Sequence, residues 1–269
     1  MENRELQGKY EKDIKRLEQF RLMDDDFMTK CFEDNAECTE LVLHIILEKT
    51  DLKVQEVRTQ YNIKNLQGRS VRLDIFAVDS DGKRYNIEIQ RENRGAAAKR
   101  ARYNSSIIDA NLLMPGSDPD SLPEVYVIFI TENDVIGKNK ALYHIDRMIK
   151  ETGDLFGDDS HILYVNGSYR GETELGRLLH DFSCTEPSDM YYSILADRVR
   201  YFKEEEGVQR MSSIMDEIRN EERMEVTITV AKRMLDAGKY ALEEISGISG
   251  LTLDEVMRIK NHEEITIDA

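Results

Sequence analysis

Hydrophobic and polar residues alternate on both sides of a short polar turn in residues 70–92, which predicts a β-hairpin. The apolar positions are every second residue of each strand: Leu73, Ile75, Ala77, Tyr85, Ile87 and Ile89. The turn, residues 79–83, permits either a two-residue Asp-Gly loop or a three-residue loop with Gly82 in the left-handed conformation. Only the three-residue loop gathers the apolar residues on one face, because side chains alternate between the two faces of a strand. We therefore predict the three-residue loop, which places Asp74 opposite Glu88.

The same kind of pattern predicts the elements on either side of the hairpin. Helical spacing of apolar residues predicts helices over 36–49 and 96–113, and alternation predicts a strand over 54–63. An uninterrupted apolar run over 125–131 predicts a buried strand. Further short strands are expected over 143–149 and 161–165, and further helices over 6–20, 172–181, 190–202, 207–235, 242–245 and 252–256. The predicted order is helix, three antiparallel strands, helix, strand, followed by a helical C-terminal third.

Length and composition indicate an ordinary globular protein. The chain has 269 residues, of which 40% are apolar and 33% charged, and this length fits one domain with an accessory segment. No apolar run is long enough to cross a membrane, and the first residues are too charged for a secretory signal. Cys31, Cys38 and Cys184 lack paired metal-type spacing, so we expect reduced thiols and a cytoplasmic location.

The charge is distributed unevenly along the chain. A net charge of −16 argues against a general nucleic-acid-binding surface, because Lys and Arg supply phosphate affinity. Residues 53–103 nevertheless hold 12 Lys/Arg and 6 Asp/Glu, a balance of +6, so the other residues carry −22. The basic segment contains the predicted hairpin. Basic surface around an acidic pair suits a phosphodiester substrate, whereas a solvated hairpin does not require it.

In the predicted register the Cβ atoms of Asp74 and Glu88 lie about 5 Å apart. Two carboxylates this close repel each other unless a cation lies between them or one is protonated. Carboxylate oxygens suit Mg²⁺ or Mn²⁺, and such an ion can activate a water and neutralise charge on a phosphate. The pair therefore predicts metal-dependent phosphodiester hydrolysis. The alternative is that both acids are solvated on the open face of the hairpin.

The same residues resemble a known signature. Asp74, the hairpin and the run Ile87-Glu88-Ile89-Gln90 are similar to the Asp…Glu-x-Lys signature of PD-(D/E)XK nucleases. The resemblance is closer to the PD-(D/E)XK nuclease family transposases, related to the recombination-promoting nucleases, in which Glu-x-Gln is common. It spans roughly residues 24–204 and is supported by the runs Thr59-Gln60-Tyr61, Gly68-Arg69-Ser70-Val71-Arg72-Leu73-Asp74, Arg100-Ala101-Arg102-Tyr103 and Val127-Ile128-Phe129-Ile130.

This resemblance implies an α/β fold with a restriction-endonuclease-like core, a central mixed sheet flanked by helices in the order α-β-β-β-α-β. We expect an N-terminal polar helix over 1–22, the nuclease-like core over 23–187, and a helical extension over 188–269 with a helix-turn-helix-like end. The implied activity is a Mg²⁺-dependent deoxyribonuclease, an endonuclease acting on DNA. The competing hypothesis is a weak or inactive nuclease-fold module that binds nucleic acid or a protein partner.

The resemblance also implies roles for individual residues. Asp74, Glu88 and the backbone carbonyl of Ile89 are expected to hold Mg²⁺ or Mn²⁺, and Gln90 completes the catalytic set. Gln90 departs from the signature Lys, because its amide can donate a hydrogen bond but carries no charge and cannot act as a base. Either the metal supplies most of the activation, or turnover is slow or lost. On this basis the substitution Gln90→Lys is expected to keep or raise activity.

Basic and aromatic residues near the hairpin are candidates for DNA contacts. One of them, Arg72, lies on the hairpin. The predicted helix over 96–113 brings the other four close together: Lys99, Arg100, Arg102 and Tyr103. They are predicted to grip a phosphate or stack on a base. The alternative is that Arg102 and Tyr103 pack and pair structurally with acids of the sheet.

Other acidic positions are weaker candidates for the metal site. In many enzymes of the resembled fold the first helix contributes an acid, and Glu37 and Glu40 are the candidates here, although a solvated helix face also explains them. The acidic run over 24–26 favours a helix N-terminus over a metal site.

The C-terminal helices carry a capping box from Thr252 to Glu255, and Gly238 fits a helix C-cap. Residues 236–262 hold three Lys/Arg and five Asp/Glu. This acidic balance favours an interaction segment, with homodimerisation through these helices, over DNA recognition.

Overall fold

The computed structural model describes residues 14–65, 68–204, 224 and 226–261. The chain divides into two compact units, Met1–Val208 and Gln209–Ala269. Of the helix predicted over 6–20, residues 14–18 are helical, and the part before residue 14 lies outside the described residues. Of the helix predicted over 207–235, only the end is described, and residues 226–237 are helical.

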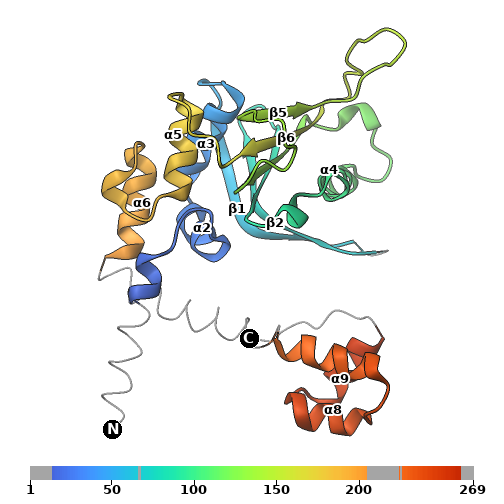
Figure 1. Ribbon diagram of the computed structural model, residues 1–269. Coiled ribbons are helices and arrows are strands. Elements are labelled where there is room, and N and C mark those ends of the chain that lie inside the picture. Colours follow the sequence, from blue (N-terminus) through green and yellow to red (C-terminus); the bar gives the residue numbers. More distant parts are fainter. Residues whose placement is uncertain (1–13, 66–67, 205–223, 225, 262–269) are drawn as a thin grey trace. The chain divides into compact units, whose positions relative to one another are not determined.

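A six-stranded mixed sheet forms the centre of the first unit (Figure 1). The strands are β1 (Val54–Ile63), β2 (Val71–Asp79), β3 (Arg84–Gln90), β4 (Val125–Thr131), β5 (Leu142–Ile145) and β6 (Ser160–Asn166). In space their order is β1-β2-β3-β4-β6-β5. Strands β1 to β3 form an antiparallel meander, β4 and β6 run parallel to β3, and β5 is antiparallel to β6.

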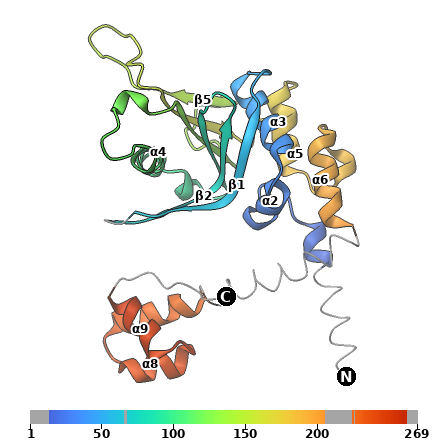
Figure 2. The ribbon, with the colours of Figure 1, turned by 180° about the vertical axis from the view of Figure 1, so that it is seen from behind.

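Helices cover both faces of this sheet. One side carries α2 (Asp25–Phe32), α3 (Ala36–Leu47), α5 (Glu174–Ser183) and α6 (Ser193–Lys203). The other side carries α4 (Ala98–Leu112), as Figures 1 and 2 show from opposite directions. Every residue of β4 is buried, because this central strand is covered from both sides. The predicted mixed α/β architecture is confirmed.

The hairpin has the predicted register. Ile75 pairs with Ile87 and Ala77 with Tyr85, and Gly82 adopts a left-handed φ of +82° in the turn. The alternative of an open, solvated hairpin face is wrong, because α4 packs on that face. Phe76, which points to the same face as Asp74, is only 6% exposed and belongs to the apolar cluster under α4.

Helix α6 belongs structurally to the first unit. It contacts α2 and α3, and Arg198 on α6 donates from Nε to the backbone oxygen of Cys31 at 3.0 Å. The boundary predicted at residue 188 assigns this helix to the C-terminal extension. The division into 1–22, 23–187 and 188–269 stays a prediction.

The second unit contains a small helical core. The helices α8 (Leu242–Ser249) and α9 (Leu253–Lys260) pack with residues 226–237. Their shared buried residues are Ala231, Ile245, Leu251, Val256 and Ile259. The predicted capping box is confirmed, and Gly238, predicted as a helix C-cap, directly follows the helical residues 226–237 with a left-handed φ of +62°. In the part of the chain that the structure describes, we find no helix with the length and apolar character needed to cross a membrane.

Candidate active site

Asp74 and Glu88 occupy neighbouring positions on β2 and β3. The regular pairing of β2 with β3 ends at Ile75 and Ile87, and the next step of the same register places Asp74 opposite Glu88. Beyond this point a side chain replaces a backbone oxygen as the acceptor between the strands, because Ile89 N donates to Asp74 Oδ2 at 2.9 Å. Asp74 is 6% exposed and Glu88 is fully buried. The strand ends thus hold two carboxylates together inside the protein.

Both carboxyl groups are in an environment that disfavours their charge. Burial raises the pKa of Asp74 well above its usual value, and the charges of Glu88 and Asp25 raise it further. Burial also raises the pKa of Glu88, against the opposing effect of the Arg100 guanidinium. The Asn86 amide lowers the pKa of Glu88, yet Glu88 Oε1 has no hydrogen-bond partner. Burial thus outweighs the nearby positive charge of Arg100, and one carboxylate oxygen of the pair, Glu88 Oε1, has no donor.

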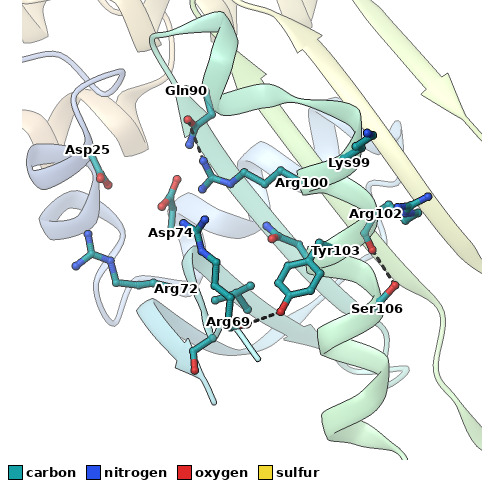
Figure 3. A pocket seen from close by; sticks show the side chains of 13 residues that line it. Asp25, Arg69, Arg72, Asp74, Gln90, Lys99, Arg100, Arg102, Tyr103 and Ser106 are labelled. Atoms are coloured by element: carbon teal, nitrogen blue, oxygen red, sulfur yellow. Dashed lines mark hydrogen bonds between the residues drawn. The ribbon is translucent and has the colours of Figure 1, made fainter. Parts of the chain in front are cut away.

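Arg100 reaches the acid pair from α4. Its Nη2 donates to Glu88 Oε2 at 2.5 Å, and its Nη1 donates to Gln90 Oε1 at 3.3 Å and to the backbone oxygen of Gly95 at 3.2 Å. Figure 3 shows Arg100 and Gln90 meeting above Asp74. A Cβ atom at Gly95 would lie 1.8 Å from Gln90 Oε1, so this close approach requires a glycine.

A pocket of about 1030 Å³ lies over Asp74. Its lining residues are Asp25, Arg69, Ser70, Val71, Arg72, Asp74, Gln90, Lys99, Arg100, Arg102, Tyr103, Asn104 and Ser106 (Figure 3). Five of these carry a positive charge, and they come from the segment before Asp74 and from α4. The pocket thus brings together all five residues predicted to contact nucleic acid. Glu88 is not among the lining residues, and Ile89 lines an adjoining pocket of about 430 Å³ with Asp25 and Gln90.

The structure adds an acid that the sequence patterns did not single out. Asp25, in the first turn of α2, lines both pockets and raises the pKa of both hairpin acids. Its Oδ1 accepts from Gln60 Nε2 at 3.0 Å, and Gln60 has a left-handed φ of +48° inside β1. The acidic run over 24–26 at the start of α2 was the available signal, but such a run is typical of a helix N-terminus.

The two acids predicted on α3 do not reach this pocket. Glu40 accepts hydrogen bonds from Lys53 Nζ at 2.8 Å and from Val54 N at 3.0 Å. Glu37 lies in the first turn of α3 and lines neither of the two pockets. Asp25, rather than either of them, is the third acid near the hairpin.

Tyr103 has structural hydrogen bonds within the pocket wall. Its hydroxyl donates to the backbone oxygen of Arg69 and accepts from Asn65 Nδ2 at 3.1 Å. These bonds tie α4 to the segment that carries Arg69 and Arg72. Tyr103 therefore supports the pocket wall and also lines the pocket, but its partners are a backbone oxygen and an amide rather than the acids of the sheet that the structural alternative predicts.

The donor set fits a hard divalent cation. Asp74 and Glu88 offer carboxylate oxygens, and the unpartnered Glu88 Oε1 is a buried acceptor that a cation would satisfy. Within the described ranges, no group of three or more His, Cys, Asp or Glu side chains is spaced to hold a metal. The site therefore supplies two close carboxylates, and backbone oxygen and water would have to complete the shell.

Comparison with known proteins adds one finding. The family model described as PD-(D/E)XK nuclease family transposase matches residues 31–169. No curated protein and no solved structure matches the chain. The matched range contains the hairpin acids, Gln90 and α4, and it begins after Asp25.

Proposed function

Because the chain belongs to the PD-(D/E)XK nuclease family transposases, we propose that it hydrolyses DNA phosphodiester bonds with the help of a divalent cation. Membership of this family supports a nuclease-type function and implies the restriction-endonuclease-like fold. The mixed sheet and its flanking helices agree with that fold. The observation that carries the proposal is the pair of buried carboxylates, Asp74 and Glu88, beside a pocket with a basic lining.

Asp74, Glu88 and the backbone carbonyl of Ile89 would hold Mg²⁺ or Mn²⁺. When bound, such a cation lowers the pKa of a water molecule and offsets negative charge on the phosphate. An opposite charge beside the buried pair also favours the ionised form of both acids. Gln90 is neutral and cannot remove a proton, so its contribution is to orient its neighbours by hydrogen bonds.

The basic residues of the pocket would bind the DNA backbone. Positive side chains neutralise phosphates and fix the register of the strand without reading its sequence. Those at the pocket surface are Arg69, Arg72, Lys99 and Arg102. Hydrolysis then proceeds by attack of a water oxygen on phosphorus, and the bond from phosphorus to the departing sugar oxygen breaks. The water loses its proton to solvent, and the departing oxygen gains one.

Nicking of supercoiled plasmid tests this proposal. The wild-type protein should nick DNA with Mg²⁺ or Mn²⁺ and stop when EDTA is added, and Asp74→Asn and Glu88→Gln should abolish nicking. Asp197→Asn is the matched control, because it also removes one acid, but an exposed one on α6. Divalent-dependent nicking by both hairpin variants would contradict the assignment.

A second candidate is a nuclease-fold module that binds DNA or a protein without cutting. Two observations favour it: Gln90 replaces the signature lysine, and Arg100 already pairs with Glu88. Calorimetric titration separates the two, because an enzyme should bind Mg²⁺ or Mn²⁺ through the acid pair. A protein that binds DNA but neither ion would be such a module.

We also propose that the helical region over 188–269 is an accessory segment through which the chain forms a homodimer. The second unit has its own buried core, and residues 236–262 hold five Asp/Glu against three Lys/Arg. Light scattering tests this by comparing the molar mass of the full chain with that of a chain that lacks residues 209–269. A full chain that remains monomeric at high concentration would exclude the homodimer.

A further inference from the structure

Arg100 is the positive group nearest to the acid pair. Within the part of the chain that the structure describes, it is the one cation that hydrogen-bonds to either Asp74 or Glu88. The adjacent basic residues line the pocket but have no such contact. A charge at this point is therefore available where a phosphate would meet the two acids.

The Arg100 guanidinium is held by several groups at once. Glu88 Oε2, Gln90 Oε1 and the Gly95 carbonyl accept from it, and its carbon lies 5.9 Å from the centroid of the Phe129 ring. These three bonds use three of the five N–H donors of an arginine. The remaining N–H groups, on Nε and Nη2, have no hydrogen-bond partner among the described residues, and the side chain is 38% exposed. The group is fixed in place yet retains donors for a ligand.

Gln90 is the residue type that this arrangement needs. Its amide oxygen accepts from Arg100, whereas a lysine ammonium at the same position could only donate and would repel the guanidinium. Gly95 leaves the space that the Gln90 side chain occupies. The family name itself places a lysine where this chain has Gln90. In this chain the positive charge beside the acid pair therefore comes from α4 and not from β3.

We propose that Arg100 is a catalytic residue that supplies the positive charge for the scissile phosphate, and that Gln90 and Gly95 are positioning residues that hold its guanidinium. This inference rests on the proposed function. As negative charge grows on the phosphate oxygens, the free N–H groups of Arg100 donate charge-assisted hydrogen bonds to them. Arg100 stays protonated throughout, so it neither takes nor gives a proton.

A charge-relocation experiment tests the proposal with four proteins: the wild type, Arg100→Gln, Gln90→Lys and the double variant. Single-turnover nicking should fall about 100-fold in Arg100→Gln, as expected for loss of one transition-state donor. Gln90→Lys should fall at least about tenfold, because the new ammonium displaces the guanidinium. This reverses the expectation from the sequence alone. The double variant should recover to within about tenfold of the wild type, because its lysine restores the charge from β3.

Binding of Ca²⁺, measured by calorimetry at alkaline pH without DNA, separates a catalytic role from a structural one. Arg100→Gln should bind Ca²⁺ more tightly, on the order of tenfold, because a positive charge next to the acids is gone. Arg200→Gln, which removes a partly exposed arginine of α6, should match the wild type in both assays. Lost Ca²⁺ binding in Arg100→Gln would show that Arg100 merely supports the fold of the site.

The remaining outcomes are equally decisive. Full nicking by Arg100→Gln, or by Gln90→Lys, would refute the inference and leave the proposed function intact. A double variant no faster than Arg100→Gln would do the same. A wild-type protein that neither nicks DNA nor binds Ca²⁺ would remove the proposed function, and this inference with it.

Discussion

Replacing Asp74 by asparagine should stabilise the protein without a metal while it abolishes nicking. Asn has the same shape, and its side-chain oxygen can keep the hydrogen bond from Ile89 N. The change removes one of the two neighbouring carboxylate charges, at a side chain that is only 6% exposed. Burial, and then the charges of Glu88 and Asp25, hold the pKa of Asp74 well above its usual value of 3.8. The folded protein therefore binds this proton more tightly than the unfolded chain.

The sign of the pH dependence follows from this difference. Below pH 3.8, Asp74 is protonated in the folded and the unfolded state and does not lower the free energy of unfolding. As pH rises from there towards the folded pKa, the unfolded chain loses the proton first, so the free energy of unfolding falls. The loss is about 1.4 kcal/mol for each pH unit within this window. For a domain of this size that corresponds to about 3–6 °C in melting temperature per pH unit.

The assay is thermal unfolding in EDTA followed by circular dichroism, because the chain has no tryptophan. The melting temperature of Asp74→Asn should exceed that of the wild type by a margin that grows from acid to neutral pH. Excess Mg²⁺ should narrow the margin, because binding to the native state stabilises the wild type alone. A margin that is flat with pH, or a variant less stable than the wild type at neutral pH, would refute the reasoning.

Three further predictions concern positions around the site and the core. Gly95→Ala should lower nicking about tenfold with a melting temperature within about 2 °C of the wild type, because its Cβ displaces only the flexible end of Gln90; an unchanged rate would contradict the close packing. Gly176→Ala in α5 should destabilise the first unit by about 1–3 kcal/mol in chemical denaturation, because its Cβ would lie 1.9 Å from a backbone oxygen. Its control is Gly247→Ala in α8, where the new Cβ would have no atom within 4 Å and should stabilise the helix by up to about 1 kcal/mol. A change in unfolding free energy of the same sign for both variants would exclude the clash at Gly176. Iodoacetamide should label Cys184 before the two buried cysteines, whose pKa values are strongly raised by burial, as mass spectrometry of the native protein can check; equal labelling of all three would contradict their burial.

Local patterns in the sequence were sufficient for the strands and for the register of the hairpin. The predicted bounds of β1 and β4 match the structure, and the left-handed Gly82 sets the predicted pairing of β2 with β3. These features depend on alternation, on apolar runs and on the conformational freedom of a turn glycine, which all lie within a few residues of each other. The neighbouring positions of Asp74 and Glu88 follow from the same local register.

Only the tertiary structure decided what surrounds those two acids. Asp25, contributed by α2, and Arg100, contributed by α4, reach the hairpin from segments that the register of β2 and β3 does not constrain. The sequence alone also left open whether the second face of the hairpin was solvated, and α4 covers it. The physical reason is that periodicity in the sequence indicates which residues are buried. The segment that buries them, or that supplies the opposite charge, depends on packing between parts of the chain that are far apart in sequence.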